Sequence, residues 1–166
     1  MQQPYFRVKK LYPDAILPTR ANILDAGIDL YAYEDVLLSS RHSAKPIEYK
    51  MTDSSYYIDD QEDPSRALIQ TGIAVEFPAG YVFLIHDRSG LSAKYAVHRL
   101  AGVIDSGYAG QLKVALINLG SKAYQIKKGD RIAQGILMPI ASPTIEEVQE
   151  LTASDRGEAG FGSTGK

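Results

Sequence analysis

The 166-residue sequence contains no cysteine, which excludes disulfides and thiolate metal sites, so any bound metal must be held by oxygen or imidazole ligands. No apolar run comes near the roughly 20 residues that span a bilayer, and no signal-peptide pattern opens the chain. The formal net charge is only −2 with mixed signs, which provides no broad basic field for a nucleic-acid polymer. These absences predict a soluble, cytoplasmic protein, in the host cytoplasm if the chain is viral, and leave room for a small anionic ligand held by a few arginines.

The length and an apolar content of 45% suit one domain with a real core, built from short strands. In the segment Asp25–Tyr33, alternation predicts a strand with Asp29 on the face opposite the apolar one. A turn at Lys127–Asp130 predicts a strand pair between its flanking apolar runs, with Gln134 in the second strand. Further strands are expected over Phe6–Leu11, Ala67–Phe77 and Tyr81–His86.

The stretch Arg99–Asn118 holds two apolar runs, Leu100–Ile104 and Leu112–Ile117, joined by a glycine-containing turn. The pattern predicts a β-hairpin. At the end of its first strand, Asp105 and Tyr108 share a tight corner where glycines would let a flat ligand approach bare backbone. We refer to Asp105–Tyr108 as the corner. An ordinary hairpin, with Asp105 capping the turn and Tyr108 on the surface, is the other interpretation.

Two further segments suggest a phosphate site. The spacing in Asp87–Val97 predicts a short helix beginning near Ser89, where backbone N–H groups and Arg88 could cradle a phosphate, although Ser89 could equally be a plain N-cap. The tail from Ser154 is rich in glycine and is either a disordered terminus or a strap that closes over a nucleotide.

Five segments with recognisable motifs follow one another along the chain: Ala26–Leu30, Arg88–Leu91, Gly102–Gly110, Gly129–Gln134 and Arg156–Gly165. In this order they resemble the motifs of the trimeric deoxyuridine triphosphatases (dUTPases). The resemblance covers nearly the whole chain, with local departures at Asp87, Gly107 and Ala159, where the family usually has proline, an acidic residue and glycine.

The resemblance implies an all-β, jelly-roll-like β-barrel with one short helix over residues 1–155, and a flexible C-terminal strap over 156–166. It also implies a homotrimer with active sites at subunit interfaces. Apolar spacing alone favours a helix at Thr144–Leu151, but the family has a strand there, so we expect a strand. The segment Glu34–Arg66 is expected to be a long loop or protruding hairpin, and about 41–66 of it is an insertion relative to the family.

The implied reaction is hydrolysis of dUTP to dUMP and pyrophosphate by attack of water on the α-phosphorus. Asp105 would deprotonate the water, Gln134 would hold the water and the phosphate, and Tyr108 would stack under the deoxyribose. Backbone groups near Gly102 would pair with uracil, and Asp29 would fix Mg²⁺ through water, the ion being held mainly by the triphosphate. The implied phosphate-binding residues are Arg88, Ser89 and Gly90, with Arg156, Phe161, Gly162, Ser163 and Thr164 closing over the γ-phosphate and base from another subunit.

Two other function classes remain open at this point. A dCTP deaminase is similar in fold and in the corner, and Gly107 makes this sequence more similar to such an enzyme. The deaminases, however, carry a catalytic glutamate where this chain has Ala115. A regulatory binding protein on the same scaffold could use the insertion to dock a protein partner, whereas the plainer interpretation of the insertion is a solvated hairpin. His42, His86 and His98 lack metal-ligand spacing and are assigned surface or core roles.

Overall fold

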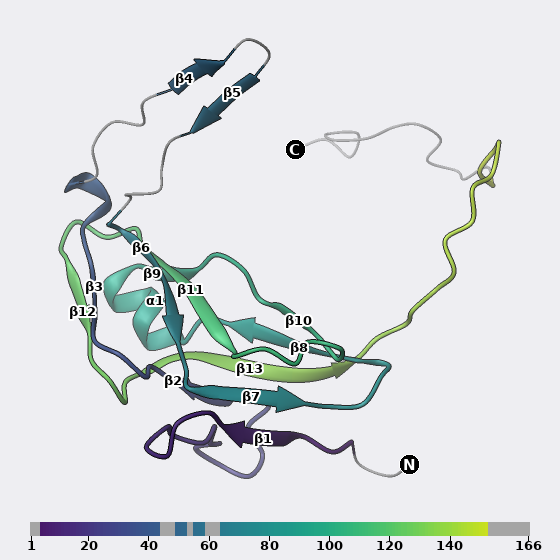
Figure 1. The fold of residues 1–166 in the computed structure, drawn as a ribbon, viewed down its shortest axis with the longest axis horizontal. Helices are drawn as coiled ribbons and strands as arrows, with labels where there is room; N and C mark the ends of the chain where they lie inside the picture. The colour runs from purple at the N-terminus through teal and green to yellow at the C-terminus, as the bar shows by residue number, and fades with distance from the viewer. Residues whose placement is uncertain (1–3, 44–48, 53–54, 59–63, 153–166) are drawn as a thin grey trace, which may run out of the picture.

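The computed structural model describes residues 4–43, 49–52, 55–58 and 64–152, and Figure 1 shows its strands and single α-helix. The expectation of an all-β chain with one short helix is confirmed. Within the described residues, no helix is long and apolar enough to span a membrane. The strands are β1 (Arg7–Lys10), β2 (Ile28–Tyr31), β3 (Val36–Leu38), β4 (Tyr49–Thr52), β5 (Ser55–Ile58), β6 (Arg66–Gln70), β7 (Ile73–Glu76), β8 (Tyr81–His86), β9 (Val97–Arg99), β10 (Val103–Asp105), β11 (Lys113–Asn118), β12 (Tyr124–Ile126) and β13 (Arg131–Pro139), with α1 at Ser89–Tyr95 and a 3-10 turn at Arg41–Ser43.

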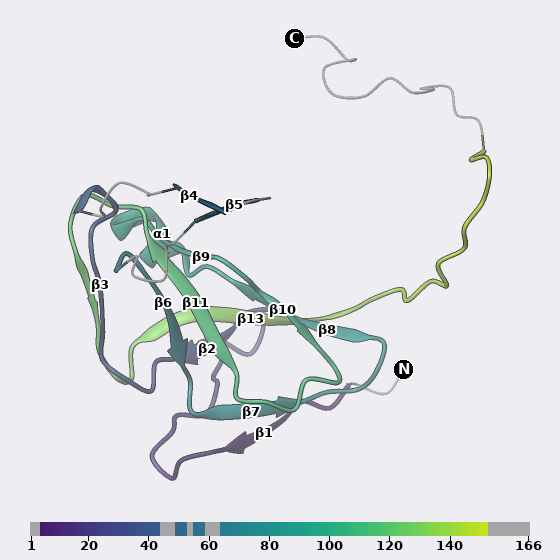
Figure 2. The same ribbon diagram turned by 45° about the horizontal axis from the view of Figure 1, so that its top comes forward.

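All strand pairs are antiparallel, and they form separate sheets that do not close into one continuous cylinder within the described residues. The largest sheet has the order β10-β8-β13-β2, and a second has the order β6-β11-β9. In Figures 1 and 2, β13 runs through the middle of the body with β11 inclined to it. The pairs β1-β7, β3-β12 and β4-β5 complete the arrangement.

The core lies between the sheets because alternate residues of the strands are apolar. Along β11, Val114, Leu116 and Asn118 are buried while the residues between them are not. Phe83 of β8 is fully buried, and the Phe6 ring packs against it in a tilted arrangement, with 4.8 Å between ring centroids. Burial of such side chains contributes about 1.5–3 kcal/mol each, which holds β8 and β13 in place beneath the site.

The predicted hairpin over Arg99–Asn118 is only partly right. Strand β9 does pair with β11, but the chain then leaves this sheet and β10 pairs with β8. The crossing occurs at Gly102, whose carbonyl accepts a bond from Ile85 N–H, and a Cβ at Gly102 would lie 2.6 Å from the Ile85 carbonyl oxygen. A glycine therefore allows a close backbone approach that apolar patterning could not indicate.

The predicted strand pair around Lys127–Asp130 is wrong, although the turn itself forms, with Asp130 N–H bonded to the Lys127 carbonyl. Strand β12 pairs with β3, and β13 pairs with β8 and β2. The turn is tied instead to the end of β2, because Ala32 bonds the backbone of both Gly129 and Asp130. These long-range bonds direct the two strands into different sheets.

Three other expectations need correction. The segment Ala67–Phe77 breaks into β6 and β7 at Gly72, which has a φ of +73°. The segment Glu34–Arg66 is not all loop, because β3 lies in it, but the hairpin β4-β5 does form and stands clear of the main sheets in Figure 1. Residues Thr144–Leu151 form neither helix nor strand. Their apolar side chains cover no sheet in the described part of the chain, where Ile145 stays 96% exposed.

Candidate functional site

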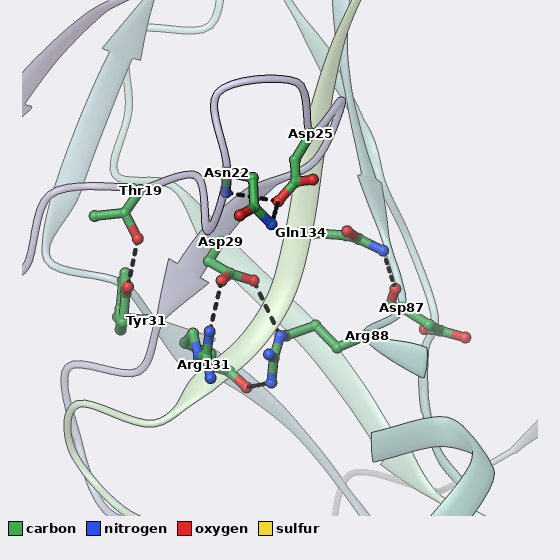
Figure 3. A network of polar contacts seen from close by, with 9 residues as sticks. All are labelled: Thr19, Asn22, Asp25, Asp29, Tyr31, Asp87, Arg88, Arg131 and Gln134. Carbon is green, nitrogen blue, oxygen red and sulfur yellow. Dashed lines mark hydrogen bonds and ion pairs between the residues drawn. The ribbon is translucent and has the colours of Figure 1, made fainter. Parts of the chain in front are cut away.

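The strand β2 presents Asp29 at the centre of a polar cluster, shown in Figure 3. Ile28 and Leu30 are buried on one face, so Asp29 projects from the other, as predicted. Its Oδ1 accepts a bond from Arg88 Nε at 3.0 Å, and its Oδ2 accepts one from Arg131 Nη1 at 3.1 Å. The carboxylate is 13% exposed and lies between two guanidinium groups that are themselves more exposed. We call Asp29, Arg88 and Arg131 the arginine cluster.

Arg88 lies directly before α1, at the junction that follows β8. It is the N-cap residue of the helix, in an extended conformation and without a side-chain capping bond, so the alternative that Ser89 is the N-cap is wrong. Ser89 and Gly90 form the first turn of α1 and are exposed. Arg88 also donates from Nη1 to the Arg131 carbonyl at 3.3 Å. Because a guanidinium has five N–H groups, donors remain for a bound anion.

Gln134 of β13 lies next to the arginine cluster because of the register in which β13 pairs with its neighbours. It lies opposite Asp29 of β2 on one side and opposite His86 of β8 on the other. Its Nε2 donates to the Asp87 carbonyl at 2.8 Å, which leaves the second N–H of the amide available. Glycine at position 27 leaves space for this side chain, since a Cβ there would overlap Gln134 Oε1.

Asp87 connects this region to β9. Its Oδ1 accepts from Arg99 N–H at 2.8 Å, and its Oδ2 lies 2.6 Å from His98 Nδ1. Burial alone would raise the pKa of the Asp87 carboxyl, but the bonds from Arg99 N–H and from the His98 and Ser92 side chains outweigh it and hold the pKa below its ordinary value of 3.8. The carboxylate is therefore ionised at neutral pH.

The corner forms as a tight turn after β10. Tyr108 N–H bonds the Asp105 carbonyl at 3.0 Å, and the Tyr108 hydroxyl donates to the Gln111 carbonyl at 2.8 Å. Asp105 is exposed and Tyr108 is 44% exposed, so both groups face outward from the chain. A Cβ at Gly110 would lie 2.7 Å from the Tyr108 hydroxyl, so this glycine allows the ring to fold back over the turn.

The chain does not bring the corner and the arginine cluster together. Asp105 lies opposite Val82 at the start of β8, whereas Gln134 lies opposite His86 at its end. Four residues along the strand and two strand spacings separate Asp105 from Gln134 by about 16 Å. The 460 Å³ groove lined by Pro4, Phe6, Val8, Pro18, Arg20, Ile28 and Leu137 contains none of the predicted site residues.

The sequence prediction placed Asp29, Arg88 and Gln134 in one site, and the structure brings these three together. It missed the parts played by Arg131, Asp87 and Gly27, although Arg131 lies inside the Gly129–Gln134 segment and could have been found there. The predicted strap residues Arg156, Phe161, Gly162, Ser163 and Thr164 lie outside the described residues.

Comparisons with known proteins agree on one family. The dUTPase family model matches residues 53–165. Deoxyuridine 5'-triphosphate nucleotidohydrolase of Clostridium kluyveri is 41% identical over 95% of this chain and 96% of its own, and that of Solanum lycopersicum is 38% identical over 98% and 82%.

Solved structures show the same fold. The dUTPase of Staphylococcus bacteriophage 80alpha, in complex with dUpNHpp, is 32% identical over 98% of this chain and 99% of its own, with a TM-score of 0.76. The dUTPase of phage phi11 of S. aureus is 28% identical over 90% and 99%, with a TM-score of 0.70. These solved structures confirm the jelly-roll-like fold that the resemblance predicted for this chain. With a family model over most of its length and relatives about 40% identical, the chain belongs to the dUTPase family.

Proposed function

We propose that this chain hydrolyses dUTP to dUMP and pyrophosphate by attack of water on the α-phosphorus. Such an activity lowers the dUTP available for DNA synthesis and supplies dUMP for dTMP synthesis. The observation that carries the proposal is the set formed by Asp29, Arg88 and Gln134, which the fold brings together from β2, from the junction before α1 and from β13. Membership of the dUTPase family gives the substrate class.

The arginine cluster suits a triphosphate because its guanidinium groups are fixed before any ligand binds. Asp29 holds Arg88 and Arg131 at 3.0 and 3.1 Å, and both keep further N–H donors for phosphate oxygens. In the proposed site, Arg88, Ser89 and Gly90 bind the α- and β-phosphates. The free N–H of Gln134 holds the attacking water or the phosphate oxygen beside it.

The residues of the proposed site suit a magnesium ion that is held mainly by the triphosphate, and they do not suit one that is held by the protein alone. Both oxygens of Asp29 already accept from guanidinium groups, and within the described part of the chain no three acidic or histidine side chains gather into a metal site. A dedicated protein cage is therefore not the arrangement that these residues suit. When bound, a Mg²⁺ held by the triphosphate would offset its negative charge, with Asp29 accepting hydrogen bonds from the water on the ion.

In the proposed reaction, Asp105 accepts the proton of the attacking water, a contribution worth about 10²- to 10⁴-fold in rate. Tyr108 lies under the deoxyribose, and the backbone around Gly102 pairs with the edge of uracil. The strap residues Arg156, Phe161, Gly162, Ser163 and Thr164 close over the γ-phosphate and the base from another subunit, which raises effective concentration and excludes water.

Geometry supports assembly of this site from more than one copy of the chain. A general base must lie within about 3 Å of the water it deprotonates, directly or through one further water. The separation of about 16 Å between Asp105 and Gln134, estimated from strand spacings, is too large for both to act on one water in one chain. We therefore infer that the corner of one subunit faces the arginine cluster and Gln134 of another, in a homotrimer.

A pyrophosphate-release assay with dUTP, dCTP and dTTP, together with the oligomeric mass, tests this proposal. The account predicts release from dUTP alone and a mass of three chains. Asp105→Asn should keep the fold and nucleotide binding but lose turnover, since an amide cannot accept the proton. Ammonia release from dCTP would favour a deaminase instead, and dUTP binding without turnover would favour a regulatory binding protein.

A further inference from the structure

Asp87 lies in the short junction between β8 and α1 and is bonded to two other strands, β9 and β13. Its carboxylate binds two consecutive residues of β9, through His98 Nδ1 at 2.6 Å and Arg99 N–H at 2.8 Å. Its carbonyl accepts from Gln134 Nε2 of β13 at 2.8 Å. The next residue in the chain is Arg88, whose guanidinium is bonded to Asp29. Asp87 therefore links β9 to Gln134 and directly precedes Arg88 in the chain.

The junction between β8 and α1 is restrained by side-chain bonds, from Asp87 to β9 and from Arg88 to Asp29. Arg88 is extended, with φ −87° and ψ 123°, and makes no side-chain cap on α1. Proline at position 87 would restrict φ directly, whereas an aspartate restricts it only through its side-chain bonds. The Asp87 carboxylate is 26% exposed and accepts on both oxygens, so its partners hold it in a single orientation.

We propose that Asp87, anchored to His98 and Arg99 N–H, is a positioning residue that aims Gln134 at the attacking water. The anchored carboxylate fixes the peptide that follows it, and this peptide presents its carbonyl oxygen to Gln134 Nε2. With one amide N–H occupied there, the other points in a defined direction. This inference rests on the role proposed above for Gln134, and Asp87 itself touches neither substrate nor water.

The test measures kcat and KM for dUTP in Asp87→Ala, Asp87→Asn, Gln134→Ala and the double variant Asp87→Ala/Gln134→Ala. We expect Asp87→Ala to lower kcat roughly tenfold and to change KM less than about twofold, because the aim of Gln134 matters most in the transition state. Asp87→Asn should recover most of the loss, since its amide oxygen still accepts from Arg99 N–H. In the Gln134→Ala background, Asp87→Ala should lower kcat by less than about twofold, because its target is gone.

Asp14→Ala is the matched control. Like Asp87, Asp14 is a carboxylate with a hydrogen-bond partner on each oxygen. Its partners are the side chains of Tyr33 and Lys128, and none of these residues belongs to the proposed site. The kcat of the Asp14→Ala variant should equal that of the native protein. If Asp87→Ala does not fold, His98→Ala replaces it, because this variant removes one bond and leaves the Arg99 bond in place.

The outcomes separate this inference from the proposed function. A native kcat in Asp87→Ala, with Gln134→Ala impaired, overturns the positioning role alone. If Asp87→Ala lowers kcat by the same factor in the native and the Gln134→Ala backgrounds, the positioning role is also overturned, because the loss then does not act through Gln134. A native kcat in Gln134→Ala overturns both the positioning role and the part assigned to Gln134.

Discussion

Gly27→Ala tests whether the orientation of Gln134 is needed for turnover. A Cβ at position 27 would overlap Gln134 Oε1 and would lie 3.1 Å from its Cδ, so the amide must turn away. Turning breaks the 2.8 Å bond from Nε2 to the Asp87 carbonyl. Gly27 is not among the glycines with positive φ, so alanine adds no backbone strain there.

The expected loss can be estimated from the bond that is broken. Leaving a partly buried polar group without its partner costs about 1–3 kcal/mol, which corresponds to roughly a 5- to 150-fold fall in kcat if it is felt in the transition state. The assay is pyrophosphate release from dUTP, with a thermal melt to show that the variant is folded.

The same substitution in Gln134→Ala provides the control. With the Gln134 side chain truncated to Cβ, the nearest atom to the new Cβ at position 27 would be Gln134 Cβ at 3.4 Å, which is an ordinary contact distance. Gly27→Ala should therefore cost almost nothing further in that background. If kcat falls by the same factor in both backgrounds, the glycine is needed for some other reason and the reasoning about Gln134 is refuted.

Three further predictions concern regions outside this contact. Removing Arg156–Lys166 should leave a folded trimer that hydrolyses dUTP poorly, and full activity or failure to fold would contradict the strap. Replacing Ser43–Asp63 with a Gly-Ser linker should spare activity and trimer formation, since β4 and β5 pair only with each other in the described structure; a folded but inactive trimer would show that the insertion helps build the site. Bonds from Lys128 and Tyr33 hold the pKa of Asp14 below 3.8, so its stabilisation is present above that pH and is lost as pH falls through the lowered pKa. The difference in Tm between native protein and Asp14→Asn should shrink below about pH 4, and a constant difference would contradict the ionic origin.

Local patterns predicted most of the strands and the face on which Asp29 lies, because alternation of apolar residues depends on nearby sequence alone. Strand pairing was harder to predict. The turn at Lys127–Asp130 formed as expected, yet β12 and β13 went to different sheets because backbone bonds to Ala32 decided their direction. Similarly, no periodicity indicates that Gly102 lets the chain cross from β11 to β8.

The sequence motifs identified most residues of the proposed site, but they did not indicate which of these residues contact one another. Arg131 binds Asp29 and Asp87 binds Gln134 across more than 40 residues of sequence, which a single sequence cannot reveal. The apolar residues of Thr144–Leu151 illustrate a different limit. Their spacing favours a helix and the family resemblance favours a strand, but among the described residues neither forms, and Ile145 and Leu151 stay exposed.

The proposal that the active site draws on two subunits can be tested most directly by complementation between Asp105→Asn and Gln134→Ala. Each variant alone should be nearly inactive. In any mixed cyclic trimer, one of the three interfaces joins an intact corner to an intact Gln134. Random mixing in equal amounts makes three quarters of the trimers mixed, so activity should recover to about a quarter of the native value. Mixed trimers, verified by differently tagged chains, that stay as inactive as the two parents would contradict the shared site.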